Sequence, residues 1–104
     1  MFTSLKFKIV NKKALRLDIY IKNQADLIEV NDKLHRKYIG KNIRLIEYFD
    51  YKFVAKKYFN AVGDEKVTEE QLDWMEDHYI AEMNMVTGEL RRHKDSELIK
   101  KYYL

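Results

Sequence analysis

The sequence contains no cysteine, no proline and only three glycines among its 104 residues. Without cysteine the chain can form neither a disulfide nor a thiolate-bound zinc site, and it has no thiol nucleophile. The glycines, Gly40, Gly63 and Gly88, are too far apart to build a phosphate-cradling loop. We therefore expect no cofactor, and the lack of cysteine favours a cytoplasmic location.

Long apolar runs are also absent. No stretch of about 18 apolar residues could span a bilayer, and residues 1–8 alternate apolar with polar side chains, unlike the apolar block of a signal peptide. The composition, 46% hydrophobic and 13% aromatic, suffices for the core of one ordinary domain. The sequence therefore predicts a single domain over residues 1–104. Abundant Lys, Ile, Asn and Tyr indicate an AT-rich genome, such as that of a low-GC bacterium, a phage or a mobile element.

The net charge of +3 is unevenly distributed along the chain. Residues 1–58 carry 14 Lys/Arg against 6 Asp/Glu, residues 59–90 carry 1 against 9, and residues 91–104 carry 5 against 2. A basic half is thus followed by an acidic segment and a basic tail. Either the acidic segment packs near the basic half and neutralises it, or the two point apart and one meets a charged partner.

Alternating side chains open the sequence. Leu5, Phe7 and Ile9 alternate with lysines, and the odd-numbered positions from Leu15 to Ile21 are again apolar. Period 2 of this kind is typical of half-buried strands. With residues 11–14 as the turn, the pattern predicts an antiparallel hairpin.

A helix is predicted after this hairpin. Asn23 is a good N-cap, and the acidic Asp26 suits the first turn. Gly40 supplies a stop signal, so the helix has about four turns. Residues 43–54 then favour strand, with a bulge or a break near residues 46–47, whereas residues 54–62 could instead be helical.

The second half contains the strongest helix signal. Thr68 and Gln71 form a capping box, and apolar residues follow at spacings of three and four: Leu72, Met75, Tyr79, Met83 and Val86. We predict a helix over residues 68–86, with a tight turn between two strands at residues 86–90 as the alternative. Residues 95–104 predict a short amphipathic helix capped by Ser96.

Together these elements predict an α+β fold. The predicted sheet is small and antiparallel, made of the N-terminal hairpin plus one or two further strands. It packs with two main helices and a short C-terminal helix.

Trp74 lies among acidic residues on the predicted helix. Its ring falls off the main apolar stripe, and Glu70, Asp73 and Asp77 are its neighbours. Tryptophan is enriched at protein-binding hot spots. We therefore predict that these four residues bind a protein; the alternative is that Trp74 packs on the sheet and the acids only solvate the helix.

Basic residues gather in residues 33–57, interleaved with aromatic residues from Tyr48 to Phe59. Lysines along a backbone and rings beneath bases are typical of single-stranded nucleic-acid binding. Because lysine outnumbers arginine, base-specific readout is not expected. The candidate nucleic-acid-binding residues are Lys33, Arg36, Lys37, Lys41, Arg44, Lys52, Lys56 and Lys57. The alternative is that half of the rings form the core and the lysines are ordinary exposed positions.

The sequence offers little for metal binding or catalysis. Asp77, His78 and Glu82 would share a helix, but nothing fixes a third or fourth partner, so no metal site is predicted. A metal-independent ribonuclease could use His35 and the residues around it as acid, base and charge stabiliser. A solvated basic helix end has the same composition, so no catalytic residue is assigned.

The favoured hypothesis is a non-catalytic binding protein. It would be a phage or mobile-element accessory protein that engages or inhibits a host nucleic-acid-handling complex through protein contacts. The alternative is a nucleic-acid-binding protein that uses the basic N-terminal half, and a small ribonuclease comes third. The opposed charges also suit a homodimer, in which the basic half of one subunit meets the acidic helix of the other.

Overall fold

The computed structural model describes residues 6–103 and confirms the α+β class. Six strands form one mixed sheet in the order β1-β2-β3-β4-β5-β6. The strands are β1 (Phe7–Lys13), β2 (Arg16–Ile21), β3 (Leu45–Phe49), β4 (Tyr79–Asn84), β5 (Glu89–Arg92) and β6 (Leu98–Lys101). The helices are α1 (Leu27–Tyr38), α2 (Lys52–Ala61) and α3 (Glu69–Glu76), and a 3-10 turn, η1 (Gln24–Asp26), precedes α1. The predicted sheet, with one or two strands beyond the hairpin, was too small, and the sheet is mixed rather than wholly antiparallel as predicted.

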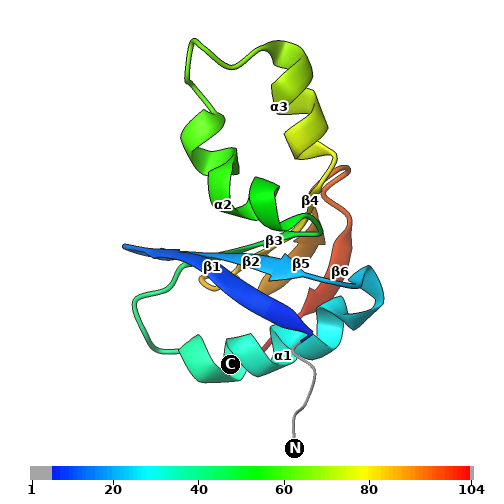
Figure 1. Ribbon diagram of the computed structural model, residues 1–104. Coiled ribbons are helices and arrows are strands. Elements are labelled where there is room, and N and C mark those ends of the chain that lie inside the picture. The colour runs from blue at the N-terminus through cyan, green and yellow to red at the C-terminus, as the bar shows by residue number, and fades with distance from the viewer. Residues whose placement is uncertain (1–5, 104) are drawn as a thin grey trace, which may run out of the picture.

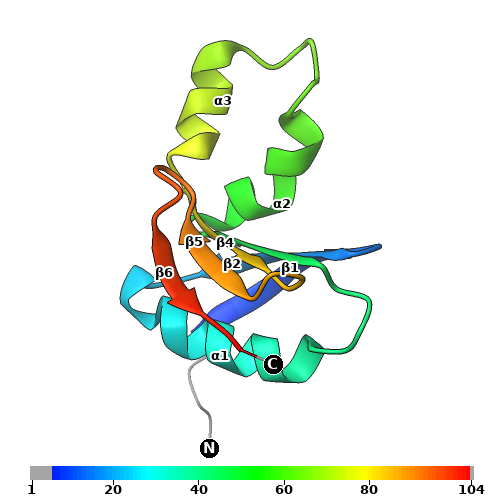
Figure 2. The same ribbon diagram turned by 180° about the vertical axis from the view of Figure 1, so that it is seen from behind.

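The connection through α1 makes the sheet mixed. Strands β2 and β3 are parallel because the chain crosses back along α1, whereas every other neighbouring pair is antiparallel. Figures 1 and 2 show α1 on one face of the sheet and α2 and α3 on the other. We call these the lower face and the upper face. Within residues 6–103, no helix has the length and apolar character needed to cross a membrane.

The N-terminal hairpin is confirmed in β1 and β2. Its turn consists of residues 14–15, with Ala14 in the left-handed region at φ 41°. Leu15 therefore lies in the turn and is 44% exposed, so its predicted place inside the strand is wrong. Leu17, Ile19 and Ile21 are fully buried, as the alternation predicts. The predicted strand residue Leu5 lies outside the described residues.

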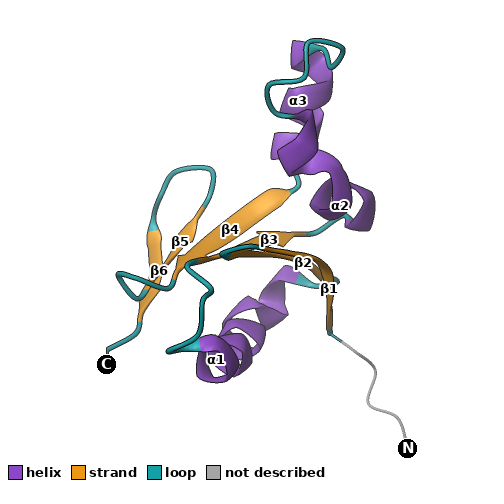
Figure 3. Ribbon diagram, turned by 90° about the vertical axis from the view of Figure 1, so that its left-hand side faces the viewer, coloured by secondary structure: helices purple, strands orange, loops and turns teal. Residues whose placement is uncertain are grey.

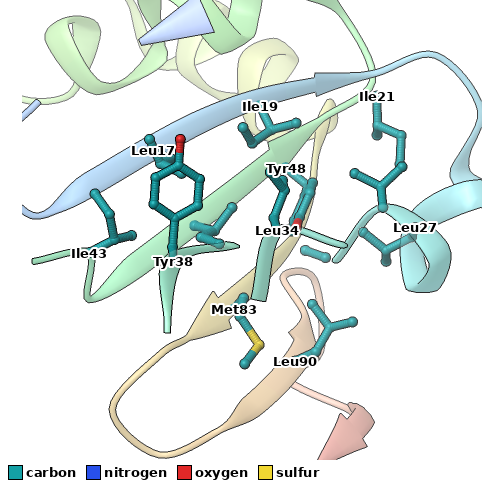
Figure 4. Close-up of a cluster of buried hydrophobic side chains, with 13 residues drawn as sticks. Leu17, Ile19, Ile21, Leu27, Leu34, Tyr38, Ile43, Tyr48, Met83 and Leu90 are labelled. Carbon is teal, nitrogen blue, oxygen red and sulfur yellow. The ribbon is translucent and has the colours of Figure 1, made fainter. Parts of the chain in front are cut away.

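The core of the lower face explains why α1 forms where it does. Asn23 Oδ1 accepts a hydrogen bond from Ala25 N at 2.9 Å, and the helix ends before Gly40, whose φ is +77°. Apolar side chains of α1 and β2 then meet in one cluster with those of β3, β4 and β5 (Figure 4). The cluster consists of Leu17, Ile19, Ile21, Leu27, Val30, Leu34, Tyr38, Ile43, Ile46, Tyr48, Ala81, Met83 and Leu90.

The predicted helix over residues 68–86 is wrong in its second half. The capping box is present, with Gln71 N donating to Thr68 Oγ1 at 3.1 Å, but α3 ends at Glu76. Strand β4 begins at Tyr79 and pairs with β3 and β5. The alternative of a tight turn between two strands is the arrangement found. At this turn Gly88 has φ +80°, and a Cβ there would lie 2.3 Å from the carbonyl oxygen of Tyr102.

Two further segments differ from the predictions. Residues 43–54 contain the strand β3, but helix α2 already begins at Lys52, in line with the helical alternative for residues 54–62. The predicted C-terminal helix is strand β6, which pairs with β5. Ser96 does not cap a helix; it has φ 59° just before this strand.

Candidate functional site

Helices α2 and α3 form an arm that rises from the upper face of the sheet (Figure 3). We define the arm as residues 51–78. Helix α2 packs on the sheet through Val54 and Ala55, whereas α3 has no buried residue. Large apolar side chains remain exposed along the arm: Tyr51, Phe53, Phe59, Val62 and Trp74.

An aromatic cluster joins the two ends of the arm. The Trp74 ring lies 5.4 Å from that of Tyr51 and 5.0 Å from that of His78, and Tyr51 and His78 are 5.2 Å apart. Trp74 and Tyr51 are each 46% exposed. His78 Nδ1 lies 2.7 Å from Asp50 Oδ1. The rings are therefore held in place by one another and by a carboxylate while part of their surface stays open to solvent.

The predicted acidic partners of Trp74 are exposed: Glu70 and Asp73 lie on α3, and Asp77 caps its C-terminus. Asp73 and Asp77 are one turn apart, and their stripe is adjacent to the stripe of Trp74 and His78. Glu70 lies one turn before Trp74. Among residues 6–103, no cation lies within ion-pair distance of Glu70, Asp73 or Asp77. The structure thus places Glu70, Asp73 and Trp74 on the exposed helix α3 and Asp77 at its C-cap.

A pocket of about 620 Å³ lies beside this acidic stripe, in the volume range of ligand sites. It is lined by Gln24, Asp73, Glu76, Asp77, Tyr79, Ile80, Arg92, His93 and Lys94. His93 stacks on Tyr79 with ring centroids 3.7 Å apart. Its Nε2 lies 3.3 Å from Glu76 Oε1 and its Nδ1 lies 3.5 Å from Glu82 Oε1. His93 thus lies between the carboxylates of Glu76 and Glu82, and its buried Nδ1 has no hydrogen-bond partner within residues 6–103.

A row of polar side chains crosses the upper face beneath α2. Asp18 pairs with Glu47 in register, and both are buried. Arg16 Nε lies 3.1 Å from Asp18 Oδ1 and 3.2 Å from Glu47 Oε1. Tyr79 Oη donates to Glu47 Oε2 at 2.6 Å. Two buried carboxylates thus share a single guanidinium.

This shared cation does not fully offset the burial of Glu47. Burial raises the pKa of Glu47 to about 7, and the adjacent Asp18 carboxylate adds to the effect. The hydrogen bond from Tyr79 and the charge of Arg16 act in the opposite direction. The Phe59 ring of α2 lies 3.4 Å from the Arg16 guanidinium carbon and covers the group. Because Phe59 of α2 covers this buried row, the protonation of Glu47 is coupled to the packing of the arm on the sheet.

The predicted nucleic-acid-binding residues do not form one surface. Lys33, Arg36 and Lys37 lie on α1 below the sheet, and Lys41 and Arg44 lie between α1 and β3. Lys52, Lys56 and Lys57 lie on α2 above the sheet. The sheet separates the two groups, because α1 and α2 cover opposite faces (Figure 3).

The interleaved aromatic residues also divide between core and surface. Tyr48 and Phe49 are buried, and Tyr58 is half-buried against Phe49 and Tyr79. Phe53 and Phe59, in contrast, are 53% and 52% exposed. Exposed rings near lysines thus occur on α2 but not on β3.

The histidines have other roles than those considered from the sequence. His35 is 9% exposed and its ring packs on Tyr102, and burial lowers its pKa. His78 and Glu82 do not share a helix, because α3 ends before them. In the part of the chain that the structure describes, no three acidic or histidine side chains lie where they could jointly hold a metal ion.

The pocket and the buried row of Arg16, Asp18 and Glu47 were not predicted from the sequence. Asp18 and Glu47 occupy the polar positions of alternating strands, so they read as solvent-facing; an acid centred in an apolar strand was the available signal. His93 had no such signal, since its neighbours come from α3 and β4.

Comparisons with models of protein families, with curated proteins and with solved structures found no match to this chain.

Proposed function

We propose that this chain is a non-catalytic binding protein whose arm docks on a protein partner. The cluster of Tyr51, Trp74 and His78 carries the proposal, because it combines exposure with fixed geometry. Side chains that are already ordered lose little conformational entropy on binding. Tryptophan and tyrosine are also the residues most enriched at binding hot spots.

The charge beside this cluster supports a basic partner. Asp73 and Asp77 are exposed and line the neighbouring pocket together with Glu76. A basic side chain of the partner could meet the exposed carboxylates of Asp73 and Asp77, whereas the pocket as a whole is of mixed charge because Arg92 and Lys94 also line it. Proteins that bind nucleic acid present basic patches. We therefore propose that the partner is a component of a nucleic-acid-handling complex, which this chain engages or inhibits.

The test compares the Trp74→Ala and Phe53→Ala variants in parallel captures from a nuclease-treated lysate of the source organism, so that capture does not depend on nucleic acid. Both variants remove an exposed ring from the arm, but only Trp74 lies in the aromatic cluster. We expect wild type and Phe53→Ala to retain a protein that Trp74→Ala loses. With that protein purified, calorimetry should show affinity for Trp74→Ala reduced by at least about 30-fold.

Two further measurements interpret this result. Circular dichroism should show that Trp74→Ala keeps the fold, since the ring is about half exposed. Light scattering should give the mass of the free chain, because a dimer that Trp74→Ala dissociates would make a second copy the partner. Equal capture by Trp74→Ala and wild type would refute the docking surface.

A further inference from the structure

Helix α2 presents a second surface, which faces away from the sheet. Lys52 and Lys56 are one turn apart, as are Phe53 and Lys57, and all four side chains are exposed. Val54, between them in sequence, is fully buried against the sheet. We call Lys52, Phe53, Lys56 and Lys57 the outer face of α2.

The edge strand β1 adds a further lysine to this face. Asn11 of β1 donates hydrogen bonds to the carbonyl oxygens of Ala55 and Lys56, at 3.1 and 3.2 Å, which fixes α2 over the edge. Contact with the Lys8 ammonium lowers the pKa of Lys52, and the charge of Lys56 adds to the effect. Lys8 also pairs in register with Tyr20, which packs against the apolar cluster of Val54 and Ala55, so the register places Lys8 on the same face of the sheet as α2.

These positive charges have no paired counter-charge in the part of the chain that the structure describes. Within residues 6–103, no carboxylate lies within ion-pair distance of Lys8, Lys52, Lys56 or Lys57. Lys6, in contrast, pairs with Glu29, and Lys100 pairs with Asp32. Ammonium groups that crowd one another without an acid are stabilised when an anion lies between them.

We propose that the outer face of α2 and the adjoining edge of β1 bind the backbone of single-stranded nucleic acid. The lysines contact successive phosphates, and Phe53, 53% exposed among them, stacks on a base. A ring beside lysines suits a strand with open bases, because every nucleotide of such a strand carries both a phosphate and a flat base. Because only lysines line this face, binding does not depend on base sequence.

This site is narrower than the basic set seen in the sequence. The lysines of α1 lie on the lower face and take no part (Figure 2). The site is also separate from the aromatic cluster of Tyr51, Trp74 and His78, which faces α3. The chain could thus hold a nucleic-acid strand and a protein at the same time.

Fluorescence anisotropy with a labelled oligothymidine tests the proposal. Wild type should bind at about 50 mM salt and weaken steeply towards about 200 mM. The double variant Lys52→Gln/Lys56→Gln should reduce the steepness of log affinity against log salt by about 1.4, which is about 0.7 for each lost phosphate contact on a single strand. Phe53→Ala should weaken binding by about tenfold through the loss of one stacked base.

Matched variants make the outcome decisive. Lys33→Gln/Lys37→Gln removes the same charge from α1 and should leave binding close to wild type. Equal losses from the two double variants would overturn the proposal, because the effect would then be one of net charge. It also fails if oligothymidine does not bind at low salt, if heparin or anionic vesicles bind instead, or if duplex binds equally well with Phe53→Ala unchanged.

Discussion

The two faces of the sheet are held by different interactions. The lower face packs thirteen buried apolar residues, most of them from the strands and α1. The upper face has four such residues, and beside them lie the buried charges of Asp18, Glu47 and Arg16. Burial of apolar surface stabilises at any pH, whereas buried charges stabilise only while paired.

The difference assigns separate tasks to the two faces. The lower face holds the fold together, since β2 contributes Leu17, Ile19 and Ile21 to it at full burial. The upper face seats the arm, which carries both proposed binding surfaces. Because only a few apolar contacts and shared charges hold the arm on the upper face, its position depends on pH and on single charged residues.

The largest effect is expected from Arg16→Met. This change removes the guanidinium that Asp18 and Glu47 share and leaves two buried carboxylates unpaired. Urea unfolding at pH 8 should show a loss of about 3–5 kcal/mol. The control, Arg92→Met, removes a 51%-exposed arginine from its pairs with Asp95 and Glu97 and should cost less than about 1 kcal/mol. Equal losses would mean that the upper-face charges are solvated.

A change in the lower core should destabilise by a similar or somewhat smaller amount. Leu34 is 1% exposed in the centre of the core of α1 and the sheet, so Leu34→Ala leaves a cavity and should cost about 2–5 kcal/mol. Ile28→Ala on the same helix is the matched control, since Ile28 is 44% exposed and should lose within about 0.5 kcal/mol. Unlike the Arg16→Met loss, the Leu34→Ala loss should be the same at pH 5 and pH 8. A loss at Leu34 no larger than that at Ile28 would place α1 outside the core.

Glu47→Gln should remove a pH dependence of stability that arises on the upper face alone. The raised pKa means that folded Glu47 binds its proton more tightly than unfolded Glu47, so stability falls as pH rises from the unfolded value of 4.5 to about 7. The slope from this group is at most about 1.4 kcal/mol per pH unit. Glu47→Gln keeps an acceptor for Tyr79 and should remove this decline, as measured by thermal unfolding across the range.

On the lower face Asp32 should show the opposite sign. Hydrogen bonds from Lys100 and Tyr102 lower the pKa of Asp32 below its ordinary value of 3.8. Its stabilisation is therefore present above that value and is lost as pH falls through the folded pKa. Asp32→Asn should cost stability at neutral pH and converge with wild type in acid. Parallel pH profiles for the Asp32 and Glu47 variants would contradict the contrast between the faces.

Local signals in the sequence predicted helices and strands, but not which helix covers each face of the sheet. Caps act within a few residues of themselves, so the capping box at Thr68 was predicted correctly, whereas Asn23 caps the 3-10 turn η1 and α1 itself begins after Asp26 without a side-chain cap. The prediction of a helix over residues 68–86 was wrong because Tyr79 and Met83 fit both the helical and the strand periodicity. Spaced by four, they share a helix face and also a strand face, and Ala81, fully buried between them, belongs only to the strand pattern.

The candidate sites also divide into those formed by residues near in sequence and those that depend on the tertiary fold. Trp74 and the acids on α3 were predictable because they are near in sequence. The burial of Asp18 and Glu47 was not, since alternation gives the face of a sheet but not whether α2 lies over it. The separation of the lysines of α1 from those of α2 likewise depends on the crossover between β2 and β3, which no local pattern records.

The smallest effect is expected at the start of α3, where Thr68→Ala removes half of the capping box. Thr68 Oγ1 accepts from Gln71 N at 3.1 Å, while Gln71 Oε1 accepts from Thr68 N at 2.9 Å. Losing the cap should cost about 1 kcal/mol. Because α3 has no buried residue, the cost should appear as local opening of the arm. Hydrogen exchange should therefore quicken at the amides of α3 and stay unchanged in β2, whereas equal acceleration in both would show that the arm and the lower core unfold as one unit.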